Sequence, residues 1–484
     1  MHSETPQLQP IKPAYHLRIL SDEQLADMKS ATLELLEEAG IHVPSERARE
    51  IYAAHGGLVD PATQIVKLPP NVVLEAMSHA PRYYTMGARS QAFDLVLDGT
   101  AMYIATDGAG TETIDFETGE RRSSTKDDVG KMARVTDYLS SMAFYWPMVS
   151  AMDYPATAPL HELDASLRNT VKHVQTETVM GETTGRYAVE MARVIAGDEE
   201  TMRSRPPISL LVCTIAPLAQ DSHGMESALL FAEAGLPVGF MSMATAGSTS
   251  PATIAGTMVV GDAEMVAAMA LIQMAYPGAP TYHSMMPGIM HPRTGAFMGS
   301  NLEGDLYYSG GVELAHMWGV PTLAGIGTEA ATSGWASAAG IASSMLLCAL
   351  CGAETASGLG LREACTLLTA EALVLDSDLH EIVRYEAAGL DTSREALALD
   401  VTKAVGPRGH FLGQKHTRRE LRKRAFSELT SEPIGGGQSG YREPVEVARE
   451  KTDWILENHH PEPLSPEQQA EFARILRAAD GELG

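Results

Sequence analysis

The sequence predicts an α/β protein with a central (β/α)8 TIM barrel and α-rich extensions at both ends. Two observations support this prediction: short apolar strand patterns alternate with helical patterns along the middle of the chain, and one type of helix-to-strand connection occurs three times. Alternating strands and helices are typical of a parallel sheet, because each helix returns the chain to the start of the next strand. We expect an N-terminal extension over residues 1–98, the barrel over 99–375 and a helical C-terminal extension over 376–484.

The N-terminal extension begins with a helical pattern over Ser21–Gly40. Ser21 is a suitable N-cap, and Gly40 ends the pattern. A second helix is expected over Ser45–His55, followed by a short strand over Ile65–Leu68. These elements predict a small, mostly helical unit in front of the barrel.

The barrel prediction depends on eight short apolar segments whose starts lie 30 to 43 residues apart. Helical patterns fill most of the gaps, for example over Thr125–Leu139, Arg186–Ile195 and Ser222–Ala234. Eight strands joined in this way fit a closed barrel, and a doubly wound open sheet is the alternative. The expected strands are Met102–Thr106, Ala143–Ser150, His173–Met180, Ile208–Ala216, Val238–Ala244, Thr281–Met286, Thr322–Gly327 and Glu354–Gly358.

A repeated Gly-x-Pro connection indicates that the helix-to-strand units share one architecture. Gly235, Gly278 and Gly319 each follow a helical pattern, and a proline stands two residues later in each case. Glycine adopts the left-handed conformation that ends a helix. Proline suits the first residue of a strand, where the missing N–H is tolerated.

The composition excludes several classes of function. The chain has 484 residues, of which 44% are hydrophobic, and 36 basic residues stand against 62 acidic ones, for a net charge of −26. Such an acidic chain is not expected to bind nucleic acid, because neutralising phosphates requires an excess of Lys and Arg. Four cysteines are too few for a disulfide framework, and the first 20 residues lack the apolar run of a signal peptide. We expect a cytoplasmic protein and a symmetric homo-oligomer.

Two long stretches without charged residues, Ala234–Gly261 and Ala330–Ala353, are long enough to span a bilayer. Both are rich in Gly, Ala, Ser and Thr, and the first contains two prolines. This composition favours buried strand–helix units, so we expect no membrane association.

In a barrel of this kind, chemistry takes place at the carboxyl ends of the strands. Asp107 follows the first expected strand, and three carboxylates at or near later strands, Glu177, Glu329 and Glu354, are the first catalytic candidates. A structural role is equally compatible with each of them, because carboxylates in such positions often cap helices or form loop ion pairs.

Aromatic and histidine side chains near strand ends are candidates for binding. Trp146, Tyr282 and Trp335 offer faces that attract a quaternary ammonium ion by the cation–π interaction, although packing in the core is the alternative for each. His283 and His291 flank a Pro-Gly turn and are possible metal ligands. Two histidines without a placed third ligand are more typical of ordinary hydrogen-bonded side chains.

One segment, residues 401–424, is basic although the chain as a whole is acidic. It has eight basic residues and one acidic residue, so its net charge is +7. Docking of an acidic partner and ion pairing with the acidic body of the chain are both compatible with this pattern. The basic residues are Lys403, Arg408, Lys415, Arg418, Arg419, Arg422, Lys423 and Arg424.

Five segments, in this order and spacing, resemble the trimethylamine methyltransferase family, and specifically its members without pyrrolysine, the quaternary amine:corrinoid methyltransferases such as glycine betaine methyltransferase. The resemblance extends over roughly residues 20–425, and the chain departs from the family pattern beyond Arg424. The segments are Glu38–Val43 (EAGIHV), Val66–Pro70 (VKLPP), Asp115–Arg122 (DFETGERR), Asn169–Lys172 (NTVK) and Gly406–Leu412 (GPRGHFL), the last followed by His416 and Thr417.

The resemblance implies a (β/α)8 barrel and transfer of a methyl group from a methylamine to the cobalt of a corrinoid protein. The cobalamin-type cofactor would then belong to the partner, with no metal bound in this chain. A neutral tertiary amine needs an electrophile to activate its nitrogen, whereas a quaternary ammonium releases a neutral amine directly. Because the chain contains only standard residues, we expect a betaine-like substrate. His283, His291, Arg293 and His410 are the candidates for holding its carboxylate by charge-assisted hydrogen bonds.

Two other functions compete with this interpretation. One is a metal-dependent barrel lyase or hydrolase with His283, His291 and either Glu329 or Glu354 as ligands. The other is a non-catalytic protein that binds betaines or a corrinoid partner. A barrel fold alone does not distinguish these functions.

Overall fold

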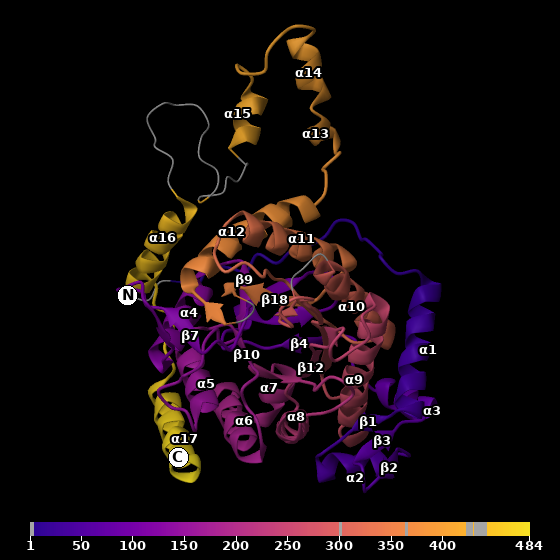
Figure 1. The fold of residues 1–484 in the computed structure, drawn as a ribbon. Coiled ribbons are helices and arrows are strands. Elements are labelled where there is room, and N and C mark those ends of the chain that lie inside the picture. The colour runs from indigo at the N-terminus through magenta and orange to yellow at the C-terminus, as the bar shows by residue number, and fades with distance from the viewer. Residues whose placement is uncertain (1–3, 300–302, 364–365, 423–428, 430–442) are drawn as a thin grey trace.

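The central part of the computed structural model is a closed eight-stranded parallel barrel (Figure 1). The structure describes residues 4–299, 303–363, 366–422, 429 and 443–484. A parallel bridge between His283 and Thr322 joins the two ends of the sheet, and the Thr322 hydroxyl donates to the His283 carbonyl at 3.0 Å. The strands, in spatial order, are β14 (Thr281–Met285), β12 (Val238–Ser242), β11 (Ile208–Cys213), β10 (His173–Thr176), β9 (Met142–Tyr145), β6 (Tyr103–Thr106), β18 (Thr355–Leu359) and β17 (Leu323–Gly325).

All eight expected strands are present, and each is followed by a helix on the outside of the barrel, so the barrel prediction is confirmed. The expected helix over Thr125–Leu139 begins at the Thr125 N-cap, whose hydroxyl accepts from the Asp128 N–H. Gly235 and Gly319 end their helices in the left-handed conformation, with φ of 80° and 75°. The helices are α4 (Lys126–Tyr138), α5 (Ala158–Asn169), α6 (Glu182–Ala196), α8 (Ser222–Ala234), α9 (Ile254–Ala275), α10 (Gly304–Trp318), α11 (Trp335–Cys351) and α12 (Ala370–Ala387).

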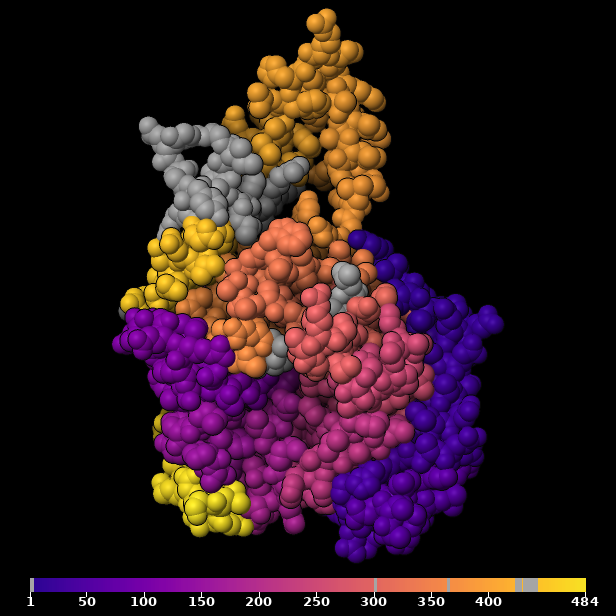
Figure 2. Space-filling model, viewed as in Figure 1, coloured from indigo at the N-terminus to yellow at the C-terminus, as the bar shows by residue number. Residues whose placement is uncertain are grey.

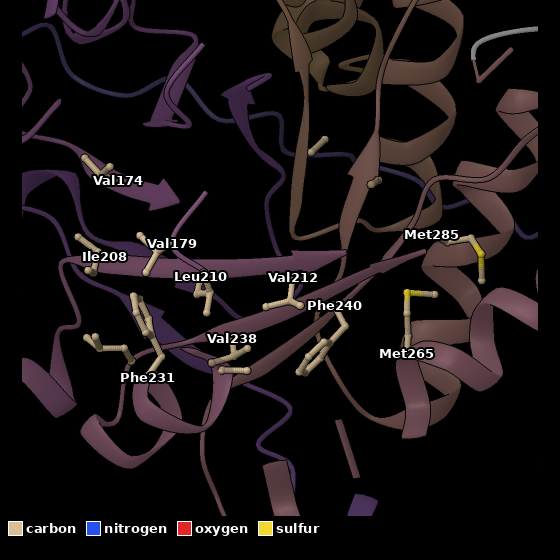
Figure 3. Close-up of a cluster of buried hydrophobic side chains, with 14 of the residues drawn as sticks. Val174, Val179, Ile208, Leu210, Val212, Phe231, Val238, Phe240, Met265 and Met285 are labelled. Carbon is tan, nitrogen blue, oxygen red and sulfur yellow. The ribbon is translucent and has the colours of Figure 1, made fainter. Parts of the chain in front are cut away.

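Side chains on the two faces of the strands form two apolar layers. On the outer face, strand residues such as Val174 and Leu210 pack with helix residues such as Phe231 (Figure 3). The inner face carries a separate cluster that includes Phe144, Leu211 and Met241 inside the barrel. Burial on both faces explains why the strands read as continuous apolar runs.

The amino end of the barrel is covered by a hairpin of β4 (Tyr84–Met86) and β5 (Leu95–Leu97). Met86 and Leu95 join the apolar cluster inside the barrel. The Tyr84 hydroxyl donates to the carbonyl of Thr281, the first residue of β14. The hairpin thereby blocks this end, and the carboxyl end remains the side on which loops can build a site.

Two small sheets formed by the loops lie at the carboxyl end. The first combines the loops after β6 and β18, and the second combines those after β12 and β14. They consist of β7 (Glu112–Ile114), β8 (Arg121–Ser123), β19 (Leu361–Arg362) and β20 (Leu367–Leu368), and of β13 (Thr245–Ala246), β15 (Gly288–Met290) and β16 (Phe297–Met298).

The N-terminal extension packs along α9 on one side of the barrel (Figure 1). Its first helix has Ser21 as the N-cap, as the sequence predicts, and Gln24 completes a capping box with it. Helix α9 alone is long and apolar enough, among the described residues, to cross a membrane, and 78% of its apolar window is buried inside the protein. The elements are α1 (Asp22–Glu38), β1 (Ile41–His42), α2 (Glu46–Ala54), β2 (Leu58–Asp60), β3 (Ile65–Lys67) and α3 (Pro70–Met77).

The C-terminal part divides into an arm and two packed helices. Residues 390–422, here called the arm, extend away from the body and carry α13 (Arg394–Leu397), α14 (Leu399–Val405) and α15 (Lys415–Leu421) (Figures 1 and 2). Helix α16 (Pro444–Asn458) packs on α12 and α4, and α17 (Pro466–Leu483) packs on α6. Of the basic segment 401–424, Lys423 and Arg424 lie outside the described residues.

Candidate active site

Four adjacent strands bring polar side chains to the carboxyl end of the barrel. Asp107 follows β6, Trp146 follows β9, Glu177 follows β10, and Cys213 ends β11. These strands are neighbours in the order β6, β9, β10, β11. Alternation along each strand places these residues on the same side as inward-facing Ala105, Phe144, Gln175 and Leu211. We call these four residues, Asp107, Trp146, Glu177 and Cys213, the mouth cluster.

Glu177 is the central acid of the mouth cluster. Its Oε1 accepts a hydrogen bond from the Cys213 thiol at 3.0 Å. Burial raises the pKa of Glu177 to about 7, the negative charges of Asp107 and Glu162 act in the same direction, and the thiol hydrogen bond opposes them. Glu177 is therefore divided between its acid and carboxylate forms at neutral pH.

Asp107 supplies a second acid. Burial raises its pKa to about 6, and the hydrogen bond from the Gly108 N–H to Oδ1, at 2.8 Å, partly offsets this effect. Both carboxylates remain half-buried rather than fully enclosed. At neutral pH the site therefore has a negative charge in a poorly hydrated environment, where a cation is strongly attracted.

Trp146 follows β9, the strand between those that precede the two acids, and its indole is buried. Its indole packs directly on Gly108, where a Cβ atom would come within 2.3 Å of Nε1. The side chain is 2% exposed, and Nε1 finds no hydrogen-bond partner among the described residues. Main-chain bonds hold the residue in place, since its N–H donates to the Thr106 hydroxyl and its carbonyl accepts from it.

A buried carboxylate on α5 fixes the loop that carries Glu177. Glu162 accepts the Thr178 hydroxyl at 2.5 Å and the Ala151 N–H at 3.3 Å. These bonds join the loops after β9 and β10, the strands that precede Trp146 and Glu177. Burial raises the pKa of Glu162, against the effect of these hydrogen bonds.

Three other sequence candidates lie in loops at the carboxyl end. Glu329 is half-buried in the loop after β17. His291 and Arg293 lie in the turn between β15 and β16. The His291 Nδ1 accepts from the N–H groups of Arg293 and Thr294, so this histidine stabilises its own turn. The Arg293 side chain is exposed and forms no ion pair with any described carboxylate.

The placement expected for His283 is wrong, because its side chain points out of the barrel. Its Nε2 donates to Asp262 on α9 at 3.0 Å, and both side chains are fully buried. Trp318 and Thr32 also donate to Asp262. His283 therefore joins the barrel to the surrounding helices, and it cannot reach the mouth cluster.

Tyr282 points into the barrel, but it lies among the apolar interior side chains. Its hydroxyl donates to Gln175 Oε1 at 2.9 Å and also lies 3.2 Å from the Leu210 carbonyl. The ring occupies the space above Gly239, where a Cβ would be 2.0 Å from the ring. The observed contacts are those of a packed core residue rather than of an open aromatic face.

Glu354 lies at the wrong end of the barrel for the expected site. It immediately precedes β18, so it belongs to the amino end. Its fully buried carboxylate pairs with Arg82 at 2.7 Å and with His316 at 3.1 Å, and it accepts the Thr322 N–H at 3.1 Å. These contacts tie together the segment just before β4, helix α10 and the residue before β17.

Two further candidates are separate from the mouth cluster. Trp335 begins α11 and is 88% exposed, so its ring is presented to solvent. His410 lies on the arm between α14 and α15 and is exposed. Trp335 follows β17 and His410 lies on the arm, so neither residue comes from the four strands that carry the mouth cluster.

The ligand set expected for a metal-dependent enzyme does not assemble. His283 lies outside the barrel, His291 lies in a turn and Glu354 lies at the opposite end, so these three side chains have no common centre. Within the part of the chain that the structure describes, no group of three or more His, Cys, Asp or Glu side chains could hold a metal ion.

Cys213 is the functional candidate that the sequence analysis missed. The only available signal was alternation: Cys213 stands two residues after Leu211 on an expected strand, which gives it the inward orientation of Leu211. Asp107 was identified as a strand-end residue but was not selected as a catalytic candidate.

Comparison with known proteins identifies the family. The family model described as Trimethylamine methyltransferase (MTTB) matches residues 2–480. Trimethylamine methyltransferase MttB of Desulfitobacterium hafniense (strain DSM 10664 / DCB-2) is 30% identical over 96% of this chain and 94% of its own length. Glycine betaine methyltransferase of Desulfitobacterium hafniense (strain Y51) is 28% identical over 98% of both chains.

A solved structure supports the fold assignment. The crystal structure of the hydroxylamine MtmB complex matches with a TM-score of 0.50 at 12% identity, over 93% of this chain and 92% of that one. At this identity the likeness concerns the fold alone. The match of one family model to almost the whole chain establishes that this protein belongs to the trimethylamine methyltransferase (MTTB) family of methyltransferases.

Proposed function

We propose that this methyltransferase moves a methyl group from a quaternary ammonium substrate, of the betaine type, to the reduced cobalt of a corrinoid carried by a partner protein. The observation that carries the proposal is the mouth cluster: two carboxylates of raised pKa and one indole at adjacent strand ends. Negative charge and an aromatic surface in a poorly hydrated site are the features that recognise a quaternary ammonium ion.

The residues at the mouth fit a methyl acceptor that another protein delivers. Asp107 and Glu177 are half-buried, so the carboxyl end of the barrel is accessible from outside. The corrinoid, when bound with its protein, supplies the nucleophile and accepts the methyl group. This chain's own task is then to bind the ammonium, exclude water around it and orient one methyl group toward the open side.

The charge balance of the reaction suits this site. The C–N bond breaks, both of its electrons remain on nitrogen and the methyl group passes to the acceptor, so the nitrogen becomes an uncharged tertiary amine and no proton has to be supplied. The carboxylates of Asp107 and Glu177 attract the cationic ammonium group of the substrate more strongly than the neutral amino group of the product. Methyl transfer therefore weakens binding, which promotes release of the amine.

The carboxylate of a betaine needs a cationic partner at the same end of the barrel. Of the four candidates expected from the sequence, His283 points away, His410 lies on the arm and His291 stabilises its own turn. Arg293 remains, with an exposed guanidinium on the loop after β14. We assign the substrate carboxylate to Arg293 by a charge-assisted hydrogen bond.

The test is a methyl-transfer assay with a panel of substrates. The purified protein is mixed with a reduced corrinoid protein or free Co(I) cobalamin, and methylcobalamin is followed by its visible spectrum. The panel contains glycine betaine, proline betaine, carnitine, choline and dimethylsulfoniopropionate, with trimethylamine as the control. Turnover of a quaternary amine supports the proposal. Tight binding of a betaine without turnover would instead indicate a non-catalytic binding protein.

A further inference from the structure

The arm forms no packed core of its own. None of its three helices, α13, α14 and α15, contains a buried residue. Figure 1 shows the arm extending from the end of α12, and Figure 2 shows that it projects beyond the body rather than lying on it. Because isolated helices of four to seven residues are unstable in water, the arm needs a surface to pack against.

Large apolar side chains are concentrated along this unsupported segment. Leu390 is 88% exposed and Leu412 is 83% exposed, and Phe411 is also exposed beside Leu412 between α14 and α15. Single exposed leucines are common on protein surfaces, but several on one projecting segment are typical of an interaction site. Leu397, Leu399 and Leu421 are the other exposed leucines of the arm.

The charge of the arm indicates what covers it. Lys403, Arg408, Lys415 and Arg418 form no ion pair with any carboxylate that the structure describes. The arm, residues 390–422, has seven basic and four acidic residues and therefore a net charge of +3, so the rest of the chain, with a total of −26, carries −29. The surface complementary to the arm is therefore an acidic one, such as the body of this same protein.

We propose that the arm docks on the acidic body of a second copy of this chain. The arm extends away from its own body, so the carboxylates it needs are those of another copy. If each arm binds the body of the other copy, the contact is self-complementary and closes as a symmetric dimer. The apolar residues Phe411 and Leu412 then become buried, and the unpaired basic residues meet carboxylates.

The test measures the oligomeric state of the full chain by size-exclusion chromatography with light scattering. Wild type is compared with the double variant Phe411→Asp/Leu412→Asp. The matched control is Leu58→Asp, which changes a leucine that is 64% exposed on β2, away from the arm. Wild type and control are expected to be dimers or larger symmetric assemblies at micromolar concentration. The dissociation constant of the assembly is expected to be at least about tenfold higher for the double variant than for wild type. This corresponds to a loss of about 1.4 kcal/mol of binding free energy.

A charge-reversal variant tests the ionic part of the proposed contact separately from the apolar part. Lys403→Glu/Lys415→Glu is expected to weaken assembly, and a rise in salt from about 0.1 M to 1 M is expected to weaken the wild-type assembly in the same direction. Thermal unfolding checks that both variants fold, because none of the substituted side chains is buried. Carbodiimide cross-links from Lys403 or Lys415 to carboxylates of another copy are expected in the wild type.

Two results would overturn the proposal. One is a wild-type chain that stays monomeric at all concentrations. The other is a double variant that keeps the wild-type assembly. If that variant also lost methyl transfer to a corrinoid protein while still methylating free cobalamin, the arm would bind the corrinoid protein instead of a second copy.

Discussion

The Glu177 carboxylate accepts the thiol hydrogen of Cys213 at 3.0 Å, across the adjacent carboxyl ends of β10 and β11. This contact orients Glu177 within a site that also contains Asp107 and Trp146. Because burial raises the pKa of Glu177 to about 7, its charge changes in the physiological range. Under the proposed function, the charge state of Glu177 therefore controls binding of the substrate cation.

Replacing Glu177 with Gln is expected to weaken binding of a quaternary ammonium about 10- to 100-fold. Glutamine keeps the size and the acceptor for Cys213 but removes a charge, and interactions with charged groups contribute about 1.5–3 kcal/mol. Isothermal calorimetry with the preferred substrate measures the dissociation constant. Cys213→Ser keeps a donor toward Glu177 and serves as the control, with affinity close to wild type. Unchanged affinity in E177Q would exclude Glu177 from the cation site.

The affinity for a quaternary ammonium is expected to rise with pH through the range of about 6 to 7. The pKa values are about 6 for Asp107 and about 7 for Glu177. Each acid is charged above its pKa, so attraction of the cation is complete above both values and is lost as the pH falls below them. The two groups interact, and the curve reports the pair rather than each residue.

Choline is a convenient ligand for this pH profile, because its ammonium does not titrate and it has no carboxylate. E177Q is expected to lose the step near pH 7 and to keep the lower one. A flat profile between pH 5.5 and 8 in the wild type would contradict the assignment of the mouth cluster as the cation site.

Arg293→Gln is expected to raise the KM for glycine betaine about tenfold and to leave the KM for choline unchanged. The two ligands share the trimethylammonium group, but only betaine has a carboxylate for the guanidinium to bind, and a charged hydrogen bond contributes about 1.5–3 kcal/mol. Methylcobalamin formation at varied substrate concentration measures both constants. Equal effects on the two substrates would show that Arg293 does not hold the carboxylate.

His283→Ala is expected to reduce stability without a specific effect on catalysis. The substitution removes one of the donors to the buried Asp262 carboxylate, which costs about 1–3 kcal/mol. Urea unfolding measures this loss, and kcat/KM of the folded variant is expected to match wild type. A variant with normal stability and greatly reduced turnover would show that His283 acts in catalysis and would contradict its structural role.

Glu354→Gln is expected to destabilise the amino end of the barrel in a pH-dependent way. Burial opposes ionisation of Glu354, but His316 and Arg82 outweigh it and lower the pKa below the ordinary value. A lowered pKa stabilises the fold above the unfolded-state value of about 4.3, and this contribution is lost as the pH falls through the folded-state pKa. The difference in unfolding free energy between wild type and E354Q is thus expected to be large at pH 7 and to shrink in acid. A difference that is constant with pH would contradict this account.

The barrel could be predicted because its strands and connections have strong local signals. Burial on both faces makes segments such as Val238–Ala244 continuously apolar, and Gly235 with Pro237 marks the turn before that strand. The same continuous apolar pattern gives no information about which strand residues face into the barrel. In Thr281–Met285 both faces are buried, so nothing in the local pattern indicates that Tyr282 points inward and His283 outward.

The errors at Glu354 and His410 have different physical causes. Glu354 immediately precedes β18, so it lies at the amino end of the barrel and not at the carboxyl end where the site was expected. Its ion-pair partner, Arg82, is distant in the sequence, so the local pattern does not reveal the pair. His410 belongs to the arm, which extends away from the barrel, and the local sequence around it gives no sign of this position. The catalytic role predicted for Glu177 and the binding role predicted for Trp146 stay predictions, although the structure places both residues at the carboxyl end of the barrel.

The most direct test of the proposed function is the rate of methylcobalamin formation from glycine betaine and from trimethylamine, measured with the wild-type chain and the same corrinoid acceptor. The account predicts turnover with the betaine or another quaternary amine of the panel, and none with trimethylamine, because a quaternary ammonium releases a neutral amine directly whereas the nitrogen of trimethylamine has to be activated first. Efficient demethylation of trimethylamine, with no quaternary amine accepted, would contradict the assignment of the substrate class.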